Sequence, residues 1–202
     1  MFIDKIIFAS NNQGKIKEMT EMLKDLGIEV LSAREAGVQE EVEEDRNTFA
    51  GNAYKKASFV AGKLRQWAVS DDTGLCIKAL EGAPGVKSAR WAGPEAGDRG
   101  LIDLTLEKMK DIPEFGRQAY FETAVVLVSP QGEHKVFKGR IEGVITREER
   151  GEMRAGLPYD LIFIPQGYEK TFAEMSGDEK NSLSHRGWAF KELKEYLGSA
   201  DF

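Results

Sequence analysis

The stretch WAVSDDTGLCIKAL, residues 67–80, places a polar segment between two short apolar runs. Trp67 to Ser70 predicts a short buried strand, and Leu75 to Leu80 predicts a second one. We interpret the segment between them, Ser70-Asp71-Asp72-Thr73-Gly74, as a turn. Ligands collect at the carboxyl ends of strands in open α/β sheets, so this turn is the first candidate for a functional site.

The segments on both sides of this stretch alternate between strand-like and helix-like patterns. Toward the N-terminus we expect strands at 5–9 and 28–31, a helix between them that Gly27 ends, and a long helix from Thr48 to about Arg65. Toward the C-terminus we expect a helix at 101–109, a hairpin of 119–129 and 135–145, a strand at 161–164, a capping box at Ser176 and Glu179, and a helix at 190–197. The chain shows no repeat or flexible linker, so the pattern predicts one α/β domain over residues 1–202.

Composition and charge exclude several classes of protein. The 202 residues carry a formal net charge of -6 and a single cysteine, Cys76, which cannot form an intrachain disulfide and which we expect to be buried. Residues 1–10 show neither a basic leader nor a small-residue cleavage site, so we do not expect secretion, and no run approaches the ~20 apolar residues of a membrane span. Mild acidity disfavours general binding to nucleic acid. We therefore expect a cytoplasmic protein without membrane or nucleic-acid partners, although a few converging basic residues would still bind a small anion.

A polar turn, Ser10-Asn11-Asn12-Gln13-Gly14-Lys15, separates the first predicted strand from the first helix. Its small and amide residues let backbone N–H groups approach an anion, and the following helix adds its positive end together with Lys15. The same residues also suit an ordinary strand-to-helix turn with a Ser or Asn cap. The segment is not a P-loop, which needs Gly at Ala9 and Ser or Thr at Ile16.

The adjacent carboxylates Asp71 and Asp72 follow an apolar strand, where charge repulsion and desolvation are costly unless a cation is present. Mg²⁺ is the natural candidate, because one or two carboxylates together with substrate phosphates usually hold it. The alternative is a turn held by Asx hydrogen bonds.

A third cluster consists of Lys180 and Ser184-His185-Arg186-Gly187. Its donors suit a phosphate or the carbonyl edge of a purine, although the same residues also suit a solvated helix start. An anion-binding turn, a carboxylate pair and a basic cluster together favour a Mg²⁺-nucleotide substrate. The chain has no paired-cysteine zinc motif, HExxH or nucleophile elbow, and we expect His134 to be solvated in the hairpin.

The ordered set of motifs resembles the inosine triphosphate pyrophosphatase family, whose members hydrolyse deaminated purine nucleoside triphosphates. The matching segments cover nearly the whole chain: Phe8 to Lys15; Glu44 with Thr48-Phe49 and Asn52-Ala53; Ser70 to Leu75; Gly82 to Val86; Ser88-Ala89-Arg90; Tyr159-Asp160; Phe163-Ile164-Pro165; Lys170 to Met175; and Ser184 to Gly187. Each motif alone is weak, and the ordered set is specific.

The resemblance implies an elongated α/β fold with a long central mixed sheet, two lobes around a nucleotide-binding cleft, and a homodimer. It also implies Mg²⁺-dependent hydrolysis between the α and β phosphates of ITP, dITP or XTP, which yields the nucleoside monophosphate and pyrophosphate. Donors aimed at a 6-keto oxygen would reject the 6-amino group of adenine.

Carried over by position, the resemblance also implies a role for each site residue. Glu44 and Asp72 would bind the metal, and Asp72 would act as the general base. The remaining residues would bind substrate: the turn Ser10, Asn11, Asn12, Gln13, Gly14 and Lys15 at the triphosphate, Thr73 beside it, and Leu157, Pro158, Tyr159, Asp160, Lys180, His185 and Arg186 around the purine.

One segment departs from the family pattern. Gly156-Leu157-Pro158-Tyr159-Asp160 stands where the family usually has Gly-Phe-Gly-Tyr-Asp, so Leu157 replaces an aromatic residue that would stack on the base, and Pro158 removes a backbone donor. Trp91 or Tyr159 would stack instead, and the sequence does not choose between them. Two alternative functions are a Maf-type pyrophosphatase acting on other nucleotides and a nucleotide-binding regulatory protein without turnover.

Overall fold

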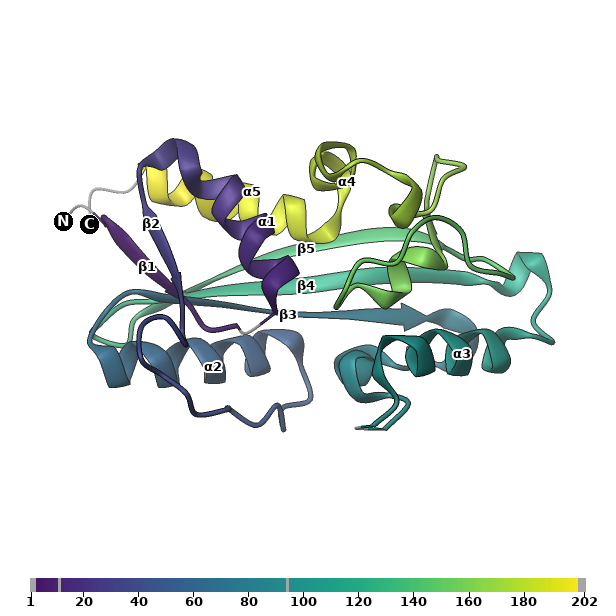
Figure 1. The fold of residues 1–202 in the computed structure, drawn as a ribbon, viewed down its shortest axis with the longest axis horizontal. Coiled ribbons are helices and arrows are strands. Elements are labelled where there is room, and N and C mark those ends of the chain that lie inside the picture. Colours follow the sequence, from purple (N-terminus) through teal and green to yellow (C-terminus); the bar gives the residue numbers. More distant parts are fainter. Residues whose placement is uncertain (1–2, 11, 94, 200–202) are drawn as a thin grey trace.

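A computed structural model describes residues 3–10, 12–93 and 95–199 (Figure 1). Its centre is a mixed sheet of six strands in the order β2-β1-β3-β4-β5-β6. The strands are β1 (Lys5–Phe8), β2 (Glu29–Ser32), β3 (Ala68–Ile77), β4 (Gln118–Val128), β5 (His134–Ile145) and β6 (Phe163–Pro165). β1 pairs in parallel with β2 and β3, and the other pairs are antiparallel. The expected α/β class with an elongated mixed sheet is confirmed.

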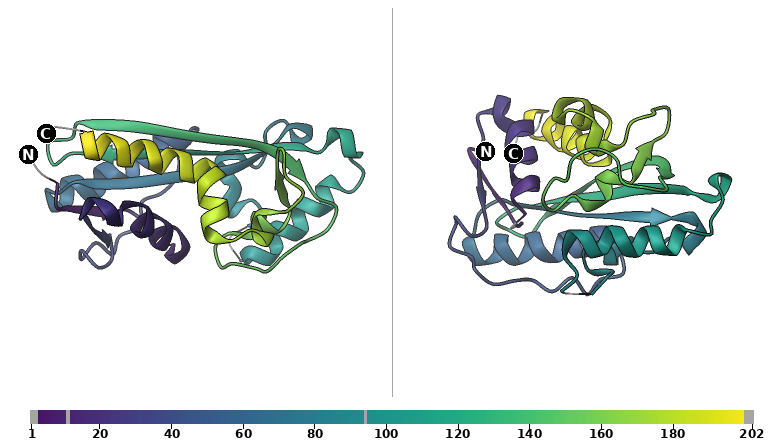
Figure 2. Two further views of the ribbon diagram at one scale, coloured as in Figure 1. Left: turned by 90° about the horizontal axis from the view of Figure 1, so that it is seen from above. Right: turned by 45° about the vertical axis from the view of Figure 1, so that its right-hand side comes forward.

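Helices cover both faces of this sheet (Figures 1 and 2). One face carries α1 (Gln13–Leu23), α4 (Gly177–Leu183) and α5 (His185–Ser199), and the other carries α2 (Phe49–Leu64) and α3 (Gly97–Met109). The short 3-10 turns are η1 (Lys24–Leu26), η2 (Lys78–Leu80), η3 (Gly85–Arg90), η4 (Glu114–Gly116), η5 (Pro158–Leu161) and η6 (Phe172–Glu174). None of the helices in the described ranges combines the length and apolar character needed to cross a membrane.

The helix starts follow the local capping chemistry of the sequence. The side chain of Thr48 accepts a hydrogen bond from Gly51 N at the start of α2, and that of Asn12 accepts one from Lys15 N at the start of α1. Ser176 likewise accepts a hydrogen bond from Glu179 N and begins α4. α4 ends at Leu183, so the closing helix starts at His185, five residues before the predicted Phe190.

The predicted turn at 70–74 is wrong, because β3 runs unbroken from Ala68 to Ile77. Every residue of β3 pairs with β4, from Ala68 opposite Val128 to Ile77 opposite Ala119. The long partner strand supplies a complete ladder, and this pairing overrides the turn preference of Asp, Thr and Gly. Gly74 marks a close approach instead of a turn, since a Cβ there would lie 2.3 Å from the carbonyl oxygen of Gly85.

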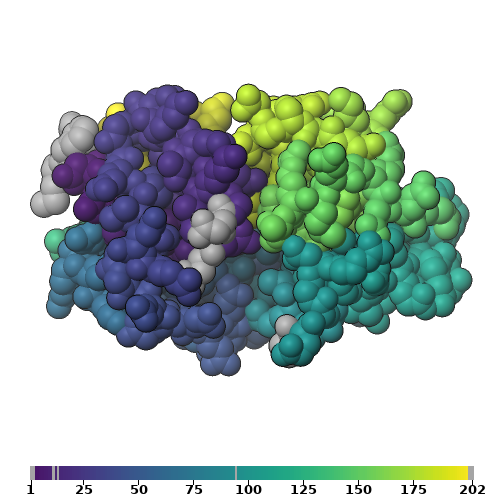
Figure 3. Space-filling model, in the orientation of Figure 1, coloured from purple at the N-terminus to yellow at the C-terminus, as the bar shows by residue number. Residues whose placement is uncertain are grey.

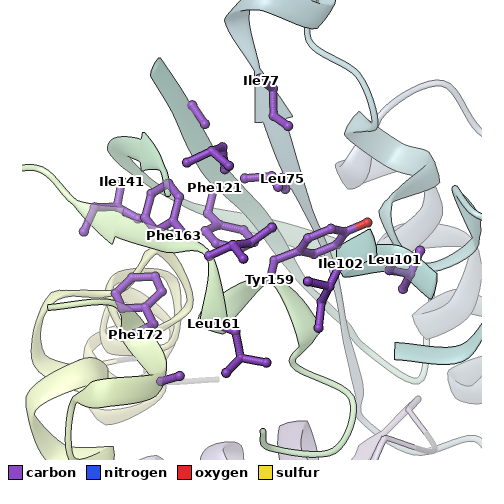
Figure 4. Packing of buried hydrophobic residues seen from close by; sticks show 14 of the residues in the cluster. Leu75, Ile77, Leu101, Ile102, Phe121, Ile141, Tyr159, Leu161, Phe163 and Phe172 are labelled. Atoms are coloured by element: carbon purple, nitrogen blue, oxygen red, sulfur yellow. The ribbon is translucent and has the colours of Figure 1, made fainter. Parts of the chain in front are cut away.

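The strand predicted at 161–164 is also displaced. Residues 158–161 form η5, and β6 comprises only Phe163–Pro165, paired with β5 from Gly143 to Ile145. Phe163 packs with Phe121, Phe172 and Tyr159 in an aromatic cluster between the sheet and the surrounding turns (Figure 4). Burying each such side chain contributes roughly 2–3 kcal/mol.

Arg117 anchors the far end of the β4–β5 hairpin. Its guanidinium is 1% exposed and donates to four backbone carbonyl oxygens, those of Met109, Ile112, Ile145 and Thr146. These contacts satisfy carbonyl groups at the end of α3 and at the end of β5. The cation therefore joins two segments that no ladder connects. Elsewhere, Cys76 is buried as expected.

Candidate active site

The short first strand leaves much of β3 without a strand partner on one side. β1 pairs with β3 only at Ile7–Ala68 and Phe8–Val69, and past Val69 no strand of the described residues pairs with β3 on that side. A cavity of about 450 Å³ lies along this edge. Figure 3 shows the surface hollowed between the blue segments and the green and teal segments. A cavity of this size is typical of small-molecule sites.

Most of the sequence-predicted site residues meet in this cavity. Asn11 lies outside the described residues, Gln13 begins α1, and Gly14 is not part of the lining. The predicted residues that line the cavity are Ser10, Asn12, Lys15, Glu44, Asp72, Thr73, Leu157, Pro158, Tyr159, Asp160, Lys180, His185 and Arg186. They come from the two ends of the chain and its middle, so only the fold brings them together.

Asp71 and Asp72 point to opposite faces of the sheet, because successive side chains alternate along a strand. Asp71 contacts Lys15 of α1 and Arg186 of α5, whereas Asp72 contacts Asn52 of α2, on the other face. The interpretation of two carboxylates repelling each other in one turn is therefore wrong. Each carboxylate has its own surroundings, and the two differ.

Asp71 is a buried counter-ion. One of its oxygens, Oδ2, lies 2.9 Å from Lys15 Nζ and 3.5 Å from Arg186 Nε. Burial alone would raise the pKa of Asp71, but the charges of Lys15 and Arg186 outweigh burial and hold it well below the usual range. The pKa of Lys15 is lowered, because burial and the neighbouring cations outweigh its ion pair with Asp71.

Asp72 lies in a less cationic environment. It accepts hydrogen bonds from Asn52 Nδ2 at 2.9 Å and from the backbone N of Thr73 at 3.0 Å. Burial and the negative charge of Glu44 raise its pKa above the usual value, and the positive charge of Lys56 opposes them. Asp72 is therefore the more basic of the two neighbouring carboxylates, as proton transfer from water requires.

Glu44 approaches Asp72 from the irregular loop before α2. Lys56 Nζ lies 2.6 Å from Glu44 Oε1 and 2.8 Å from the carbonyl oxygen of Asp71, and Arg90 donates to Glu44 Oε2 at 3.1 Å. Burial would raise the pKa of Glu44, but Lys56 and the other cations lower it. The ammonium of Lys56 thus pairs with the Glu44 carboxylate and joins the loop before α2 to the backbone of β3.

The basic cluster at the start of α5 is buried, so its interpretation as a solvated helix start is wrong. Lys180, His185 and Arg186 are each less than 5% exposed. Lys180 Nζ lies 2.8 Å from Asp160 Oδ2, and both Lys180 and Arg186 form ion pairs with Glu18. The carboxylates hold these donors in fixed directions toward the cavity.

His185 stacks on Phe121 with ring centroids 4.7 Å apart and an interplanar angle of 10°. Burial, followed by the charges of Arg186 and Lys180, lowers its pKa well below the usual value, so the ring is neutral at physiological pH. Gly139 of β5 makes this placement feasible, because a Cβ there would lie 1.8 Å from the carbonyl oxygen of His185.

The segment 156–160, which departs from the family pattern, forms one wall of the cavity. Leu157 lines the cavity, and the hydroxyl of Tyr159 donates to the carbonyl oxygen of Ser88 at 2.8 Å. Of the two aromatic candidates for stacking, Tyr159 lines the cavity, and Trp91 is not part of the lining. Asp98 of α3 accepts a hydrogen bond from Gly156 N at 2.8 Å and fixes the start of this wall.

The sequence analysis gave no role to Glu18, Asn52, Lys56 or Thr123, although Asn52 stands in one of the matching segments. Glu18 stands three residues after Lys15 on α1, a spacing that places both side chains on one helix face. Asn52 and Lys56 stand on the α2 stripe that also carries buried Phe49 and Ala53. A polar residue within an apolar helical stripe is the signal that identifies such positions.

The charged residues lining the cavity number four basic and six acidic, so the lining has a formal charge of -2 with His185 neutral. The basic residues are Lys15, Lys56, Lys180 and Arg186, and the acidic ones are Glu40, Glu41, Glu44, Asp72, Asp98 and Asp160. Among the described residues, no group of three or more His, Cys, Asp or Glu side chains is arranged to hold a metal ion. Glu44 and Asp72 therefore offer two carboxylates, and a metal here would need further ligands from substrate or water.

Fold and site together define an α/β protein with a highly charged cavity at the open edge of a mixed sheet. A family model, the Ham1 family, matches residues 6–196, and the chain belongs to this family. It is 44% identical over 193 residues to a curated dITP/XTP pyrophosphatase of Desulforamulus reducens, covering 96% of this chain and 95% of the relative. It is 42% identical to the dITP/XTP pyrophosphatase of Bacillus subtilis, with 98% of both chains covered.

Solved structures agree with this assignment. A HAM1 protein from Coxiella burnetii superimposes with a TM-score of 0.88 at 38% identity, covering 99% of this chain and all of the other. The Staphylococcus aureus Ham1 protein superimposes with a TM-score of 0.84 at 36% identity, covering 96% and 98%. The resemblance to the inosine triphosphate pyrophosphatase family is thereby confirmed.

Proposed function

We propose that the protein is a Mg²⁺-dependent pyrophosphatase that hydrolyses ITP, dITP and XTP to the nucleoside monophosphate and pyrophosphate. The observation that carries the proposal is one cavity that Glu44 and Asp72 line together with Lys15, Lys180 and Arg186. The names of the curated relatives, which share 42–44% of their residues with this chain, support the same substrates.

The charge of the cavity supports a role for a divalent cation. Six of the ten charged residues that line the cavity within the described ranges are acidic, and a carboxylate repels a phosphate placed beside it unless a cation lies between them. Glu44 and Asp72 suit this task because they are oxygen ligands on one cavity wall, and the charge of Glu44 helps raise the pKa of Asp72. When bound, the cation would neutralise charge that develops on the phosphate oxygens.

Different residues of the chain would bind the triphosphate and activate the attacking water. Lys15 and the N-terminus of α1 would hold the triphosphate, with Ser10 and Asn12 beside it. Asp72 would take a proton from the attacking water, whose oxygen forms the new bond to phosphorus. The bond between that phosphorus and the α–β bridging oxygen breaks, and pyrophosphate or the monophosphate leaves with the bridging oxygen.

The buried basic cluster would select the base. Lys180 and Arg186 donate hydrogen bonds that a 6-keto oxygen accepts, and the amino group of adenine would meet them as a second donor. Glu18 and Asp160 form ion pairs with Lys180 and Arg186. Turning the N–H donors of these two cations away from the base would break the ion pairs, which costs free energy. Leu157 and Tyr159 would contact the ring of the base.

We also propose a cytoplasmic homodimer that acts on free nucleotides and binds neither membrane nor nucleic acid, with residues 1–202 forming a single domain. Val136 and Val144 of β5 support dimerisation, since both apolar side chains are more than a third exposed. Light scattering in solution tests the dimer, because a monomer at micromolar concentration would contradict it.

A nucleotide panel tests the function. ITP, dITP, XTP, ATP, GTP and pyrimidine nucleotides are assayed separately for pyrophosphate and orthophosphate, with and without Mg²⁺. We expect pyrophosphate from the keto purines in Mg²⁺ only; orthophosphate as the only product, or equal turnover of ATP and GTP, refutes the proposal. Preference for pyrimidine nucleotides would indicate a Maf-type enzyme, and tight binding without turnover would indicate a regulatory protein.

A matched pair of variants tests whether Lys15 binds the triphosphate. Lys15 is largely buried against Asp71, whereas Lys17, two residues later on α1, is 78% exposed. Lys15→Ala should lower kcat/KM by at least about a hundredfold if the ammonium contacts the triphosphate. Lys17→Ala should leave it within about twofold.

A further inference from the structure

A chain of hydroxyl groups reaches Asp71 from inside the sheet. Thr73 of β3 and Thr123 of β4 stand directly opposite each other, and their Oγ1 atoms are 2.6 Å apart. Thr73 Oγ1 also lies 3.0 Å from Asp71 Oδ2, and Thr123 Oγ1 lies 3.1 Å from the carbonyl oxygen of Asp72. Thr123 is fully buried, so it cannot touch a ligand itself.

Two hydroxyl protons serve three contacts in this chain, and the charge of the acceptors decides its direction. Each hydroxyl has one proton to donate, and the carboxylate of Asp71, in its ion pair with Lys15, can only accept. Two oxygens 2.6 Å apart need a proton between them. If Thr73 gave its proton to Thr123, an unshared pair on Thr73 would face the Asp71 carboxylate at 3.0 Å without a proton between. If Thr123 gives its proton to Thr73 instead, the contact without a proton is the one between Thr123 and the neutral carbonyl oxygen of Asp72. Because a charged acceptor binds a proton donor more strongly than a neutral one, the favoured arrangement runs from Thr123 to Thr73 to Asp71.

This direction leaves Thr73 without a proton for an anionic ligand. Its only hydroxyl proton points to Asp71, and one of its lone pairs accepts from Thr123. The second lone pair would repel a phosphate oxygen. Thr73 lines the cavity, but its hydroxyl donates to the buried carboxylate of Asp71.

We propose that Thr123 is a positioning residue that acts through Thr73 to hold the carboxylate of Asp71 between Lys15 and Arg186. The proposal rests on the proposed function for its kinetic readout. Asp71 Oδ2 is the single atom that Thr73 Oγ1, Lys15 Nζ and Arg186 Nε all approach, and Asp71 Oδ1 has no hydrogen-bond partner within the described residues. Without Thr73, only flexible basic side chains would fix the rotation of this carboxylate.

The consequence concerns binding more than chemistry. Lys15 comes from α1 and Arg186 from α5, so Asp71 sets the spacing between the groups proposed to hold the triphosphate and the base. Asp72, the proposed general base, points to the other face of the sheet. A carboxylate of Asp71 that Thr73 no longer fixes should therefore raise KM and leave kcat largely unchanged.

A double-mutant cycle tests the chain of hydroxyls. Thr73→Val and Thr123→Val each remove one hydroxyl with almost no change in shape, and we measure KM and kcat for ITP in both singles and in the double variant. We expect KM to rise about tenfold in Thr73→Val and about fivefold in Thr123→Val, as loss of a hydrogen bond to or toward a charged group implies. The double variant should resemble Thr73→Val, because Thr123 then has nothing to orient.

Two controls separate positioning from general damage. Thr123→Ser keeps the hydroxyl and should restore KM to within about twofold of the wild type. Thr146→Val removes a buried hydroxyl at the far end of β5, where Thr146 Oγ1 donates to the carbonyl oxygen of Glu148, and it should not change KM. Unfolding free energies of all variants show whether any lost its fold.

Several outcomes would overturn the proposal. These are a KM for the double variant near fiftyfold, the product of the singles; a wild-type KM in Thr123→Val; or a fall in kcat with KM unchanged. A wild-type protein without pyrophosphatase activity would refute the proposed function alone. The hydroxyl chain would then be judged on the unfolding free energies, where the two singles should again be non-additive.

Discussion

Replacing Asp72 with Asn separates the general base from the rest of the site. The change removes the proposed proton acceptor and one of the two proposed metal-binding carboxylates while conserving volume. Loss of a general base alone costs roughly 10²–10⁴ in rate, so we expect kcat for ITP to fall at least about a thousandfold.

The fold should survive this substitution, because two effects oppose each other. Asp72 accepts from both Asn52 Nδ2 and Thr73 N, and an Asn side chain has one oxygen, so one hydrogen bond is lost at a cost of about 1–2 kcal/mol. Against this, the raised pKa of Asp72 means that its charge destabilises the folded state at neutral pH, and Asn removes that charge. The free energy of unfolding should stay within about 2 kcal/mol of the wild type.

The assay is pyrophosphate release at several Mg²⁺ concentrations, with urea unfolding as the stability measurement. Glu44→Gln is the comparator, because it removes a proposed metal ligand and leaves the base in place. Raising Mg²⁺ should restore part of the activity of Glu44→Gln and none of that of Asp72→Asn. An Asp72→Asn protein with kcat within tenfold of the wild type would refute the assignment and redirect it to Glu44 or Asp71.

Four further variants test other parts of the structure. Asp71→Asn removes the counter-ion of buried Lys15 and leaves Arg186 with Glu18 as its carboxylate partner, so calorimetry should show a loss of about 3 kcal/mol and a melting temperature lower by roughly 6–12 °C; an unchanged value would contradict the buried ion pairs. Arg117→Lys can make at most three of the four carbonyl contacts and should lose about 2 kcal/mol in urea unfolding while KM for ITP stays at the wild-type value. The pKa of His185 is lower in the folded state than in the unfolded state, where it is near 6.5, so protonation of the ring below that pH favours unfolding. The free energy of unfolding should therefore fall by up to about 1.4 kcal/mol per pH unit as the pH drops toward 5. In His185→Gln the free energy of unfolding should depend less steeply on pH. Leu157→Phe places an aromatic ring on the cavity wall and should lower KM for ITP about fivefold, whereas an unchanged KM would mean that Leu157 does not contact the base.

Local sequence patterns predicted helices better than the course of β3. The capping residues Thr48, Asn12 and Ser176 act within four residues of their own position, so the sequence alone contains the interaction. The continuity of β3 through Asp71 and Gly74 depends on β4, about fifty residues later, and no local preference reports such a partner.

The motifs named residues that the fold brings to one cavity, but they did not name the residues that support them. Lys15, Asp72 and Arg186 line the cavity, as residues of one site would. Glu18 and Lys56 were missed, because each supports a motif residue from another element and stands outside the motifs. Their effect depends on distances that only the folded chain defines.

The open edge of β3 explains how one dipeptide supplies two different carboxylates to the same site. Alternation along the strand sends Asp71 toward the helices that carry Lys15 and Arg186, where it becomes a permanent counter-ion. The same alternation sends Asp72 toward α2, where an amide and one ammonium leave its pKa raised. Past Val69, no strand of the described residues pairs with β3 on the β1 side, so the cavity reaches Asp72. Asp71 stays buried and contacts Lys15 and Arg186, which line the same cavity. The alternation of side chains along this part of β3 thus gives adjacent carboxylates different basicity beside one cavity.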